Sequence, residues 1–461
     1  MPSSPAYAAF GNWLGLTYGR PLVSRIAIIG AGLAGSECAL QLASSGVAVD
    51  LFEMRPGHST PVHKSALPAE LVCSNSFKSM VLPSAAATLK VELESLGSAL
   101  LALAKAHQVS AGKALAVDRW AFAEAVGAAL KAQPQINYIE QEITTLAGFK
   151  DYDGIVVASG PLTSESLATQ IASLLGQDNL HFFDAAAPIV SAESLDLGLF
   201  FAASRGQADS ADYLNLALDR EQYLAFHRDL IAAETVPLRD FEEKYFQACQ
   251  PIEVVAKSGL DALRFGALKP VGLIDPKSGR RPYAVIQLRA ETPERTAFNL
   301  VGFQTNLTFA AQRQLIHSLP GMTTAEFQRY GVMHANVFVN APLLAKLVAT
   351  YRPRLYFAGQ ITGTEGYSEA IASGLYCALK ILHSDFELPL ETTFGSLLHY
   401  AESADPAHYQ PMHVNYGLLG AYAPLQPPCK RRRERYQAYS DRAIAKAREL
   451  AAKWELQPYV C

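Results

Sequence analysis

The feature that most limits the fold of this chain is a glycine-rich turn between a short β-branched run and a helix-forming segment. Arg25–Gly30 (RIAIIG) predicts a strand, Ala31–Ser45 predicts a helix, and Val47–Glu53 (VAVDLFE) predicts a second strand. Together they form a βαβ unit of about 30 residues, as a dinucleotide-binding fold requires. Further strands are expected at Ile136–Ile143 and Gly154–Ala158. We therefore predict an α/β fold with a parallel, doubly wound sheet.

The turn itself fits the GxGxxG pattern that holds a pyrophosphate. Its residues are Gly30, Ala31, Gly32, Leu33, Ala34 and Gly35. The first glycine permits the tight turn, the second lets backbone N–H groups approach a pyrophosphate, and the third lets the helix pack on the strand. Glu53 ends the next strand, where a carboxylate accepts the ribose hydroxyls of an adenosine and disfavours a 2′-phosphate. The pattern predicts FAD or NAD, and a merely glycine-rich turn is the alternative.

A second strand-to-helix turn, near the end of the chain, decides between these two cofactors. Arg354–Gly359 (RLYFAG) predicts a strand that runs through Gln360 into a helix expected over Glu365–Leu382. In flavoproteins such a turn brings a helix N-terminus to the flavin, where its positive end stabilises negative charge on the reduced ring. We therefore expect tightly bound FAD, contacted by Gly359 and Gln360. An ordinary βα loop is the alternative.

Composition narrows the class of protein. The 461 residues are half apolar, and no apolar stretch is long enough to span a bilayer, so a membrane protein is not expected. Lysines and arginines number 39 against 43 acidic residues, a net charge of −4, so any RNA contact must use a local patch. Six cysteines without a CxxC pair predict reduced thiols in a cytosolic protein, and we assign no metal site.

Changes in character along the chain predict its domains. Residues 1–24 lack the pattern of a secretory signal and are expected to be a disordered extension, with a translation start near Val23 as a further hypothesis. Residues 25–191 and 333–461 are predicted to form one Rossmann-like FAD-binding domain in two parts, ending in a basic helix. Residues 192–332 have long polar loops and many aromatic residues, and are expected to form an inserted α+β domain that binds substrate or RNA.

Two segments between the strands have opposite patterns. Ser84–His107 has apolar residues three or four apart, which predicts one amphipathic core helix capped by Ser84. Arg55–Lys78 contains prolines, histidines and hydroxyls without a sustained period, which predicts a long functional loop.

Two cysteines are candidates for nucleophilic chemistry. Cys73 lies in the long loop among hydroxyls and an amide, with Lys78 close by. Nearby cations and backbone donors lower the pKa of a thiol and make it nucleophilic. Cys249 is followed closely by a proline that breaks any helix, so we place it on a turn. A buried apolar role is the alternative for both, and it fits Cys38 and Cys377 better, because these lie in predicted helices.

A stretch of cations interleaved with tyrosine and prolines is the candidate RNA contact. Such a mixture suits a phosphate backbone and a stacked base. The residues singled out are Lys269, Arg280, Arg281 and Arg289. A solvated face is the alternative, and the basic run Lys430–Arg435 has the same two interpretations.

Taken in order, the motifs resemble those of TrmFO, the family of folate- and FAD-dependent tRNA (uracil-5-)-methyltransferases. They are IIGAGLAGSE, FEMRP, ELVCSNS, ALAVDR, PIEV, LKPVGL, PYAVIQLR, NLVGFQTNLT, RYGVMH and FAGQITGTEGY. ELVCSNS and the block from LKPVGL to NLVGFQT are specific, whereas GAGLAG is shared by flavoproteins in general. Leu216 and Ala335 depart from the family pattern, which has a cysteine and an arginine there.

The resemblance implies methylation of C5 of the T-loop uridine in tRNA. It implies 5,10-methylenetetrahydrofolate as carbon donor, reduced FAD as reductant, NADH or NADPH as the electron source, and a cytoplasmic enzyme with no stable protein partner. Cys73 would lie beside the flavin and support the carbon transfer, and Cys249 would add to C6 of the base. Three alternatives stay open: the same chemistry on a ribosomal RNA uridine, flavin-dependent modification of a wobble uridine, and a non-catalytic FAD-binding RNA chaperone.

Overall fold

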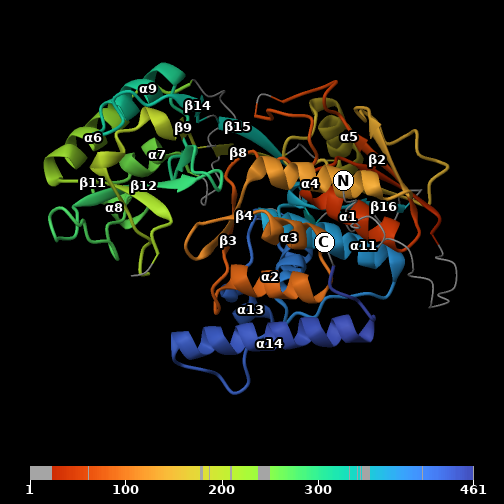
Figure 1. Cartoon of the computed structure of the whole chain (residues 1–461). Helices are drawn as coiled ribbons and strands as arrows, with labels where there is room; N and C mark the ends of the chain where they lie inside the picture. The colour runs from red at the N-terminus through yellow and green to blue at the C-terminus, as the bar shows by residue number, and fades with distance from the viewer. Residues whose placement is uncertain are drawn as a thin grey trace, which may run out of the picture.

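The computed structural model describes most of the chain from Val23 to Tyr459 (Figure 1). It leaves out residues 1–22, 61, 177–179, 186, 208–209, 237–249, 332, 340, 343, 345–353, 407–408 and 460–461, and gives only the backbone of 180–185 and 333–336. Most of the predicted N-terminal extension and Cys249 therefore lie outside the described residues. Within the described part, no helix combines the length and the apolar character needed to cross a membrane.

A five-stranded parallel sheet is the centre of the first unit of the fold. In spatial order its strands are β16 (Arg354–Phe357), β7 (Gly154–Val157), β1 (Arg25–Ile29), β2 (Ala48–Glu53) and β6 (Ile136–Glu140). Side chains of β1 alternate between two cores: Ile26 and Ile28 pack on the side of α1 (Leu33–Ser44), whereas Ile29 packs on the side of α5 (Glu165–Leu175). Helices thus cover both faces, which confirms the predicted doubly wound sheet.

The remaining elements of this unit surround that sheet. The helices are α2 (Ala85–Ser95), α3 (Ala99–Ala106), α4 (Arg119–Ala132), α11 (Tyr367–Leu382), α12 (Thr393–Ser403), α13 (Tyr416–Tyr422) and α14 (Arg432–Lys453). A small antiparallel sheet adds β3 (Ser76–Ser79), β5 (Ala114–Val117) and β4 (Gln108–Val109). Figure 1 shows α14 along the edge of the molecule farthest from β14 and α9 of the second unit.

The single helix predicted over 84–107 is wrong, because the structure has two helices there. Ser84 does cap α2 by accepting from the N–H of Ala87. The chain then breaks at Gly97, whose φ is +83°, and Ser98 caps α3 by accepting from the N–H of Leu101. The apolar spacing continues across the break, so periodicity alone could not reveal it.

A six-stranded antiparallel sheet is the centre of the second unit. Its strands, in spatial order, are β10 (Phe200–Ala202), β11 (Tyr213–Leu218), β12 (Ala284–Ala290), β13 (Ala297–Leu300), β9 (Ile189–Ser191) and β14 (Phe327–Arg329). The helices of this unit are α6 (Arg220–Ala232), α7 (Ile252–Lys257), α8 (Ala262–Phe265) and α9 (Phe309–His317). The chain passes between the units through the antiparallel pair β8 (Leu180–Ala185) and β15 (Met333–Phe338). The exact boundaries of an inserted domain at 192–332 stay a prediction.

Candidate active site

A pocket opens at the carboxyl ends of β1, β2 and β7, where a doubly wound sheet binds its ligand. It contains about 530 Å³ of space not filled by atoms, part of which is open to solvent. Its lining includes Gly30, Gly32, Glu53, Arg55, Ser159 and Thr163. The predicted dinucleotide-binding turn therefore borders an open pocket.

Gly30 and Gly35 have the steric roles that their spacing predicts, and Gly32 has open space beside it. Gly30 has φ of +101°, and a Cβ there would lie 2.7 Å from the carbonyl oxygen of Ala158. A Cβ on Gly35 would lie 1.8 Å from the carbonyl oxygen of Gly30, so only glycine lets α1 pack this closely on β1. A Cβ on Gly32 would meet nothing within 4 Å. That open space, at the N-terminus of α1, fits the pyrophosphate of a bound FAD.

Glu53 is buried beside this turn, and its carboxylate is held ionised. One oxygen accepts from the N–H of Ala31 at 3.0 Å, and the other accepts from Nε of Arg55 at 2.8 Å. Burial acts to raise the pKa of Glu53, but the hydrogen bond and charge of Arg55 outweigh it and hold this pKa below its ordinary value. Because each carboxylate oxygen accepts more than one hydrogen bond, Glu53 can still bind a ribose hydroxyl in the pocket.

The second turn joins β16 to α11 on the α1 side of the sheet. Gly359 has φ of +85°, and its N–H donates to Oγ of Ser373 at 2.8 Å. Gln360 opens a short 3₁₀ turn and donates from Nε2 to the carboxylate of Glu365 at 2.7 Å. The helix begins at Tyr367, two residues later than predicted. Gly359 would bring a Cβ within 2.7 Å of Ala34, so the two glycine-rich turns are neighbours.

The loop that carries Cys73 is held at the start of α11, beside the second turn. The backbone N–H groups of Cys73 and Ser74 both donate to the hydroxyl of Tyr367, at 3.0 and 3.2 Å. From the second unit, the Arg329 guanidinium donates to the carbonyl oxygens of Val72 and Cys73 at 2.9 and 2.8 Å. Cys73 is therefore fixed where the two units meet, next to the turn assigned to the flavin.

Arginines from both units surround this loop. Arg119 pairs with Glu291, with its Nε donating at 2.7 Å, and donates to the carbonyl oxygen of Leu71. Loss of solvation and the charge of Arg119 lower the pKa of Arg329, whereas Glu291 and Cys73 act to raise it, and the net result is a pKa of about 10. The positive charge that the sequence assigned to Lys78 thus comes from Arg119 and Arg329, since Lys78 pairs with Glu369 instead.

Arg289 belongs to the same cluster and is not a surface residue. It is only 7% exposed on β12, and its Nε donates to Oδ1 of Asn75 at 2.7 Å. Asn75 in turn donates to the carbonyl oxygen of Ala290 at 3.1 Å. Burial lowers the pKa of Arg289. The RNA contact of Arg289 therefore stays a prediction: its charge was visible in the sequence, but its burial in the cluster around the Cys73 loop was not.

The other predicted RNA contacts lie on the surface of the second unit. Lys269, Arg280 and Arg281 are exposed in the segment between α8 and β12. The N–H of Asp275 donates to the carbonyl oxygen of Arg280 and closes a hairpin there. Among the described residues, no hydrogen bond or ion pair joins these three cations to the Cys73 loop.

The described residues on either side of 237–249 form backbone hydrogen bonds to the same segment, residues 304–306. The N–H of Val236 donates to the carbonyl oxygen of Asn306 at 2.9 Å, and the N–H of Ile252 donates to that of Gln304 at 2.7 Å. Cys249 itself lies outside the described residues, and so does its predicted turn. Cys38 and Cys377 are buried in α1 and α11, as predicted.

Three residues of the site were missed at the level of sequence: Arg119, Arg329 and Tyr367. Each lies inside a quoted motif, ALAVDR, RYGVMH or FAGQITGTEGY, so the motifs signalled the positions but not their partners. Their contacts to the Cys73 loop cross between distant segments of the chain, which local patterns do not show.

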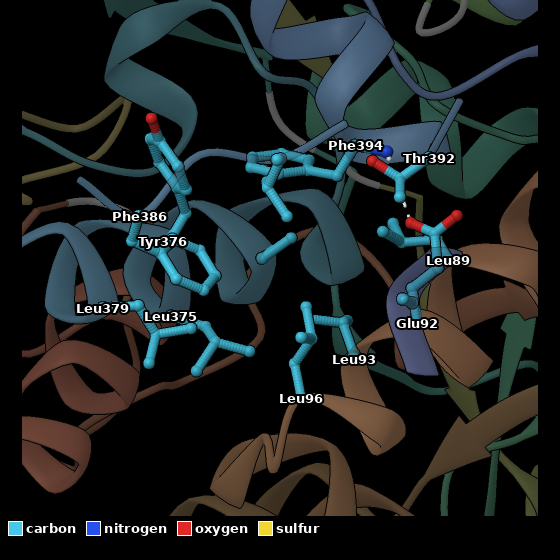
Figure 2. Close-up of a pocket in the computed structure, with 13 residues that line it drawn as sticks. Leu89, Glu92, Leu93, Leu96, Leu375, Tyr376, Leu379, Phe386, Thr392 and Phe394 are labelled. Atoms are coloured by element: carbon cyan, nitrogen blue, oxygen red, sulfur yellow. Dashed lines mark hydrogen bonds between the residues drawn. The ribbon is translucent and has the colours of Figure 1, made fainter. Parts of the chain in front are cut away.

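A second cavity lies away from this site and is apolar. Side chains from α2, α11 and the start of α12 surround about 340 Å³ of unfilled space, as Figure 2 shows. They include Leu89, Leu93, Leu375, Leu379, Phe386 and Phe394. Glu92 at its rim accepts from the N–H and the hydroxyl of Thr393, at 2.7 and 2.9 Å, so it caps α12.

Glu92 is expected to make the protein less stable as pH rises. Burial raises the pKa of its carboxyl to about 7, despite the hydrogen bonds from Thr393. Because the folded pKa lies above the unfolded value, this group stays protonated longer in the folded state, and its contribution to stability falls between about pH 4.5 and 7. Relative to Glu92→Gln, the wild type should lose about 2–3 kcal/mol of unfolding free energy between pH 5 and 8.

Urea denaturation of both proteins at pH 5 and 8 measures this difference. Glu94→Gln is the matched control, because Glu94 lies on the same helix with 56% of its side chain exposed. If the difference in unfolding free energy between wild type and Glu92→Gln is the same at pH 5 and pH 8, the Glu92 carboxyl ionises with its ordinary pKa.

Comparisons with known proteins agree with this geometry. Residues 25–385 match the family model described as Glucose inhibited division protein A. A protein of Heliobacterium modesticaldum named methylenetetrahydrofolate–tRNA-(uracil-5-)-methyltransferase TrmFO is 47% identical over 429 residues, covering 91% of this chain and 96% of the relative. A protein of Syntrophus aciditrophicus with the same name is 45% identical over 442 residues, covering 93% of this chain and 97% of the relative.

A solved structure supports the fold class. GidA of Aquifex aeolicus superposes with a TM-score of 0.65 at 14% identity, covering 94% of this chain and 74% of that chain. At this identity the likeness concerns the fold alone. Together with the parallel sheet, it confirms the predicted Rossmann-like α/β class.

Proposed function

This chain belongs to the TrmFO family, and on that premise we propose that it methylates C5 of a uracil in tRNA, with 5,10-methylenetetrahydrofolate as carbon donor and FAD as cofactor. The finer proposal is that the target is the T-loop uridine, that reduced FAD is the reductant, and that NADH or NADPH supplies the electrons. We also propose a cytoplasmic enzyme that acts without a stable protein partner.

The position of Cys73 is the observation that carries this proposal. The Tyr367 hydroxyl holds its loop at the flavin-side turn, while Arg329 holds the same loop from the second unit. A thiol at this junction can act on a group bound in the first unit and on a base presented by the second. The cations Arg119 and Arg329 favour the thiolate, because an opposite charge nearby stabilises the ionised form.

The chemistry requires a second thiol, because C5 of uracil is a poor nucleophile. Cys249 is assigned to add to C6, which turns the base into an enolate that can form the new bond from C5. When bound, FAD supplies the reducing electrons and relays the carbon unit from the folate. As the C5 proton leaves, the bond between the methylene carbon and the nitrogen that carried it breaks, which leaves an exocyclic methylene on the base. This methylene takes up a hydride equivalent, two electrons and a proton, to become the methyl group, and expulsion of the Cys249 thiolate restores the ring.

The remaining assignments follow the geometry of each residue. Residues 30–35 and Glu53 are assigned to the adenosine and pyrophosphate of FAD, and Gly359 and Gln360 to its flavin end. Lys269, Arg280 and Arg281 are assigned to RNA phosphates, because they are exposed. Arg289 is assigned instead to supporting the Cys73 loop through Asn75.

One assay tests the proposed function directly. The FAD-loaded protein, methylenetetrahydrofolate, NADH or NADPH and an unmodified tRNA transcript are combined without S-adenosylmethionine, and methylated uridine is located by mass spectrometry. We expect product at the T-loop uridine and none when the folate is omitted. Product on ribosomal RNA alone would show that the same reaction acts on a ribosomal RNA uridine instead of a tRNA uridine. Product on neither RNA would overturn the proposal in favour of a non-catalytic FAD-binding protein.

A further inference from the structure

We propose that Phe309 is a stacking platform for an unpaired base of the RNA substrate, beside the base that is methylated. This inference rests on the function proposed above and names a residue that the sequence did not single out. Phe309 is the first residue of α9, and 54% of its surface is exposed.

Phe309 ends a stack of three nearly parallel rings. Its centroid lies 4.6 Å from that of Tyr330, with 19° between the ring planes, and Tyr330 lies 4.4 Å from Phe327 at 9°. Tyr330 covers one face of Phe309, so the opposite face is the one left for a further flat ring. Nearly parallel rings at these separations form an offset stack, and a nucleic-acid base can continue such a stack on an aromatic side chain.

The platform is rigid and is tied to the Cys73 loop. Gln312 is 1% exposed and bonds Gly331 in both directions, accepting from its N–H at 2.7 Å and donating to its carbonyl at 2.8 Å. This locks α9 against the segment that carries Tyr330. The residue before Tyr330 is Arg329, which holds the carbonyl of Cys73. Figure 1 shows α9 and β14 together at one edge of the second unit.

The charge beside the platform suits a nucleotide. Arg313 lies one helical turn after Phe309, is exposed, and donates from Nη2 to the Tyr330 hydroxyl at 2.6 Å. The chain as a whole carries a net charge of −4, so attraction of RNA phosphates depends on local cations such as Arg313, which is fixed beside the exposed ring of Phe309. A base on Phe309 would bring its phosphate near this guanidinium. An unpaired base is therefore the occupant that matches both the flat apolar face and the adjacent positive charge.

The test measures RNA affinity rather than activity. The dissociation constant of the FAD-loaded protein for an unmodified tRNA transcript is compared among wild type, Phe309→Ala, Phe309→Leu and Phe309→Trp. We expect alanine and leucine to weaken binding about 5- to 150-fold, and tryptophan to keep it within about twofold, because stacking needs a π face and not merely an apolar side chain. The slope of log Kd against log salt should not change, since no phosphate contact is removed.

A second readout follows the ring itself. The fluorescence of Phe309→Trp should be quenched when the transcript is added, whereas that of Leu390→Trp, a 37% exposed position in the first unit, should not. If wild-type protein does not bind the transcript, the proposed function fails and this inference fails with it. If wild type binds and Phe309→Leu binds equally well, or if both tryptophans are quenched alike, only the stacking role is overturned.

Discussion

Replacing Cys73 with alanine should reduce methylation of tRNA by roughly 10³-fold or more, while FAD stays bound. The backbone of Cys73 donates to the Tyr367 hydroxyl and accepts from the Arg329 guanidinium, and these two hydrogen bonds do not involve the side chain. Alanine therefore keeps the loop in place and removes only the sulfur. Serine should not restore activity, because a hydroxyl next to Arg119 and Arg329 is still far from ionised at neutral pH.

The measurement is the rate of methylated uridine formation, with flavin absorbance as the check that the cofactor is retained. Cys429→Ala is the matched control, because Cys429 is a free thiol in the segment before α14 and donates to the backbone carbonyl of Arg431 at 3.7 Å. Its rate should stay within about twofold of wild type. A Cys73→Ala protein with normal activity would remove this thiol from the mechanism.

The first unit was predictable because its signals are local. The glycines at 30 and 35 act within one turn, and each shows the steric role that its spacing implies. The same holds for the cap at Ser84, which acts on a backbone N–H three residues away. Sequence reasoning succeeds where the chemistry of a position is decided by neighbours within a few residues.

The surroundings of Cys73 were not predictable, because they are assembled from distant segments. Arg329 lies 256 residues after Cys73 in the chain, and Tyr367 lies 294 residues after it. The sequence indicated Lys78 as the nearby cation, but in the structure Lys78 forms an ion pair with the buried carboxylate of Glu369. The charge of a residue is given by its identity, whereas its burial depends on the whole fold, and this is why the burial of Arg289 was not predicted.

Replacing Cys249 with alanine should abolish methylation as completely as replacing Cys73, but the reaction should stop at a different step. Without a thiolate to add at C6, C5 of the uracil does not become nucleophilic, so a loss of roughly 10³-fold or more is expected. The Phe309 stack and the exposed cations of the second unit are unchanged in this variant, so its affinity for tRNA should stay within a few-fold of wild type.

A transcript containing 5-fluorouridine separates the two cysteines. Fluorine at C5 makes C6 more electrophilic, so the C6 adduct accumulates even before carbon transfer. After carbon transfer, C5 carries fluorine and no proton, so elimination of the thiolate is blocked and protein and RNA stay covalently joined. We expect this adduct with Cys73→Ala if Cys73 acts only in the carbon transfer, and we expect none with Cys249→Ala. Denaturing gel electrophoresis distinguishes the free and joined forms. Methylation retained by Cys249→Ala, or an adduct formed by it, would assign the attack on C6 to another residue. The hydrogen bonds that fix the residues flanking 237–249 to Asn306 and Gln304 would then have a structural role only.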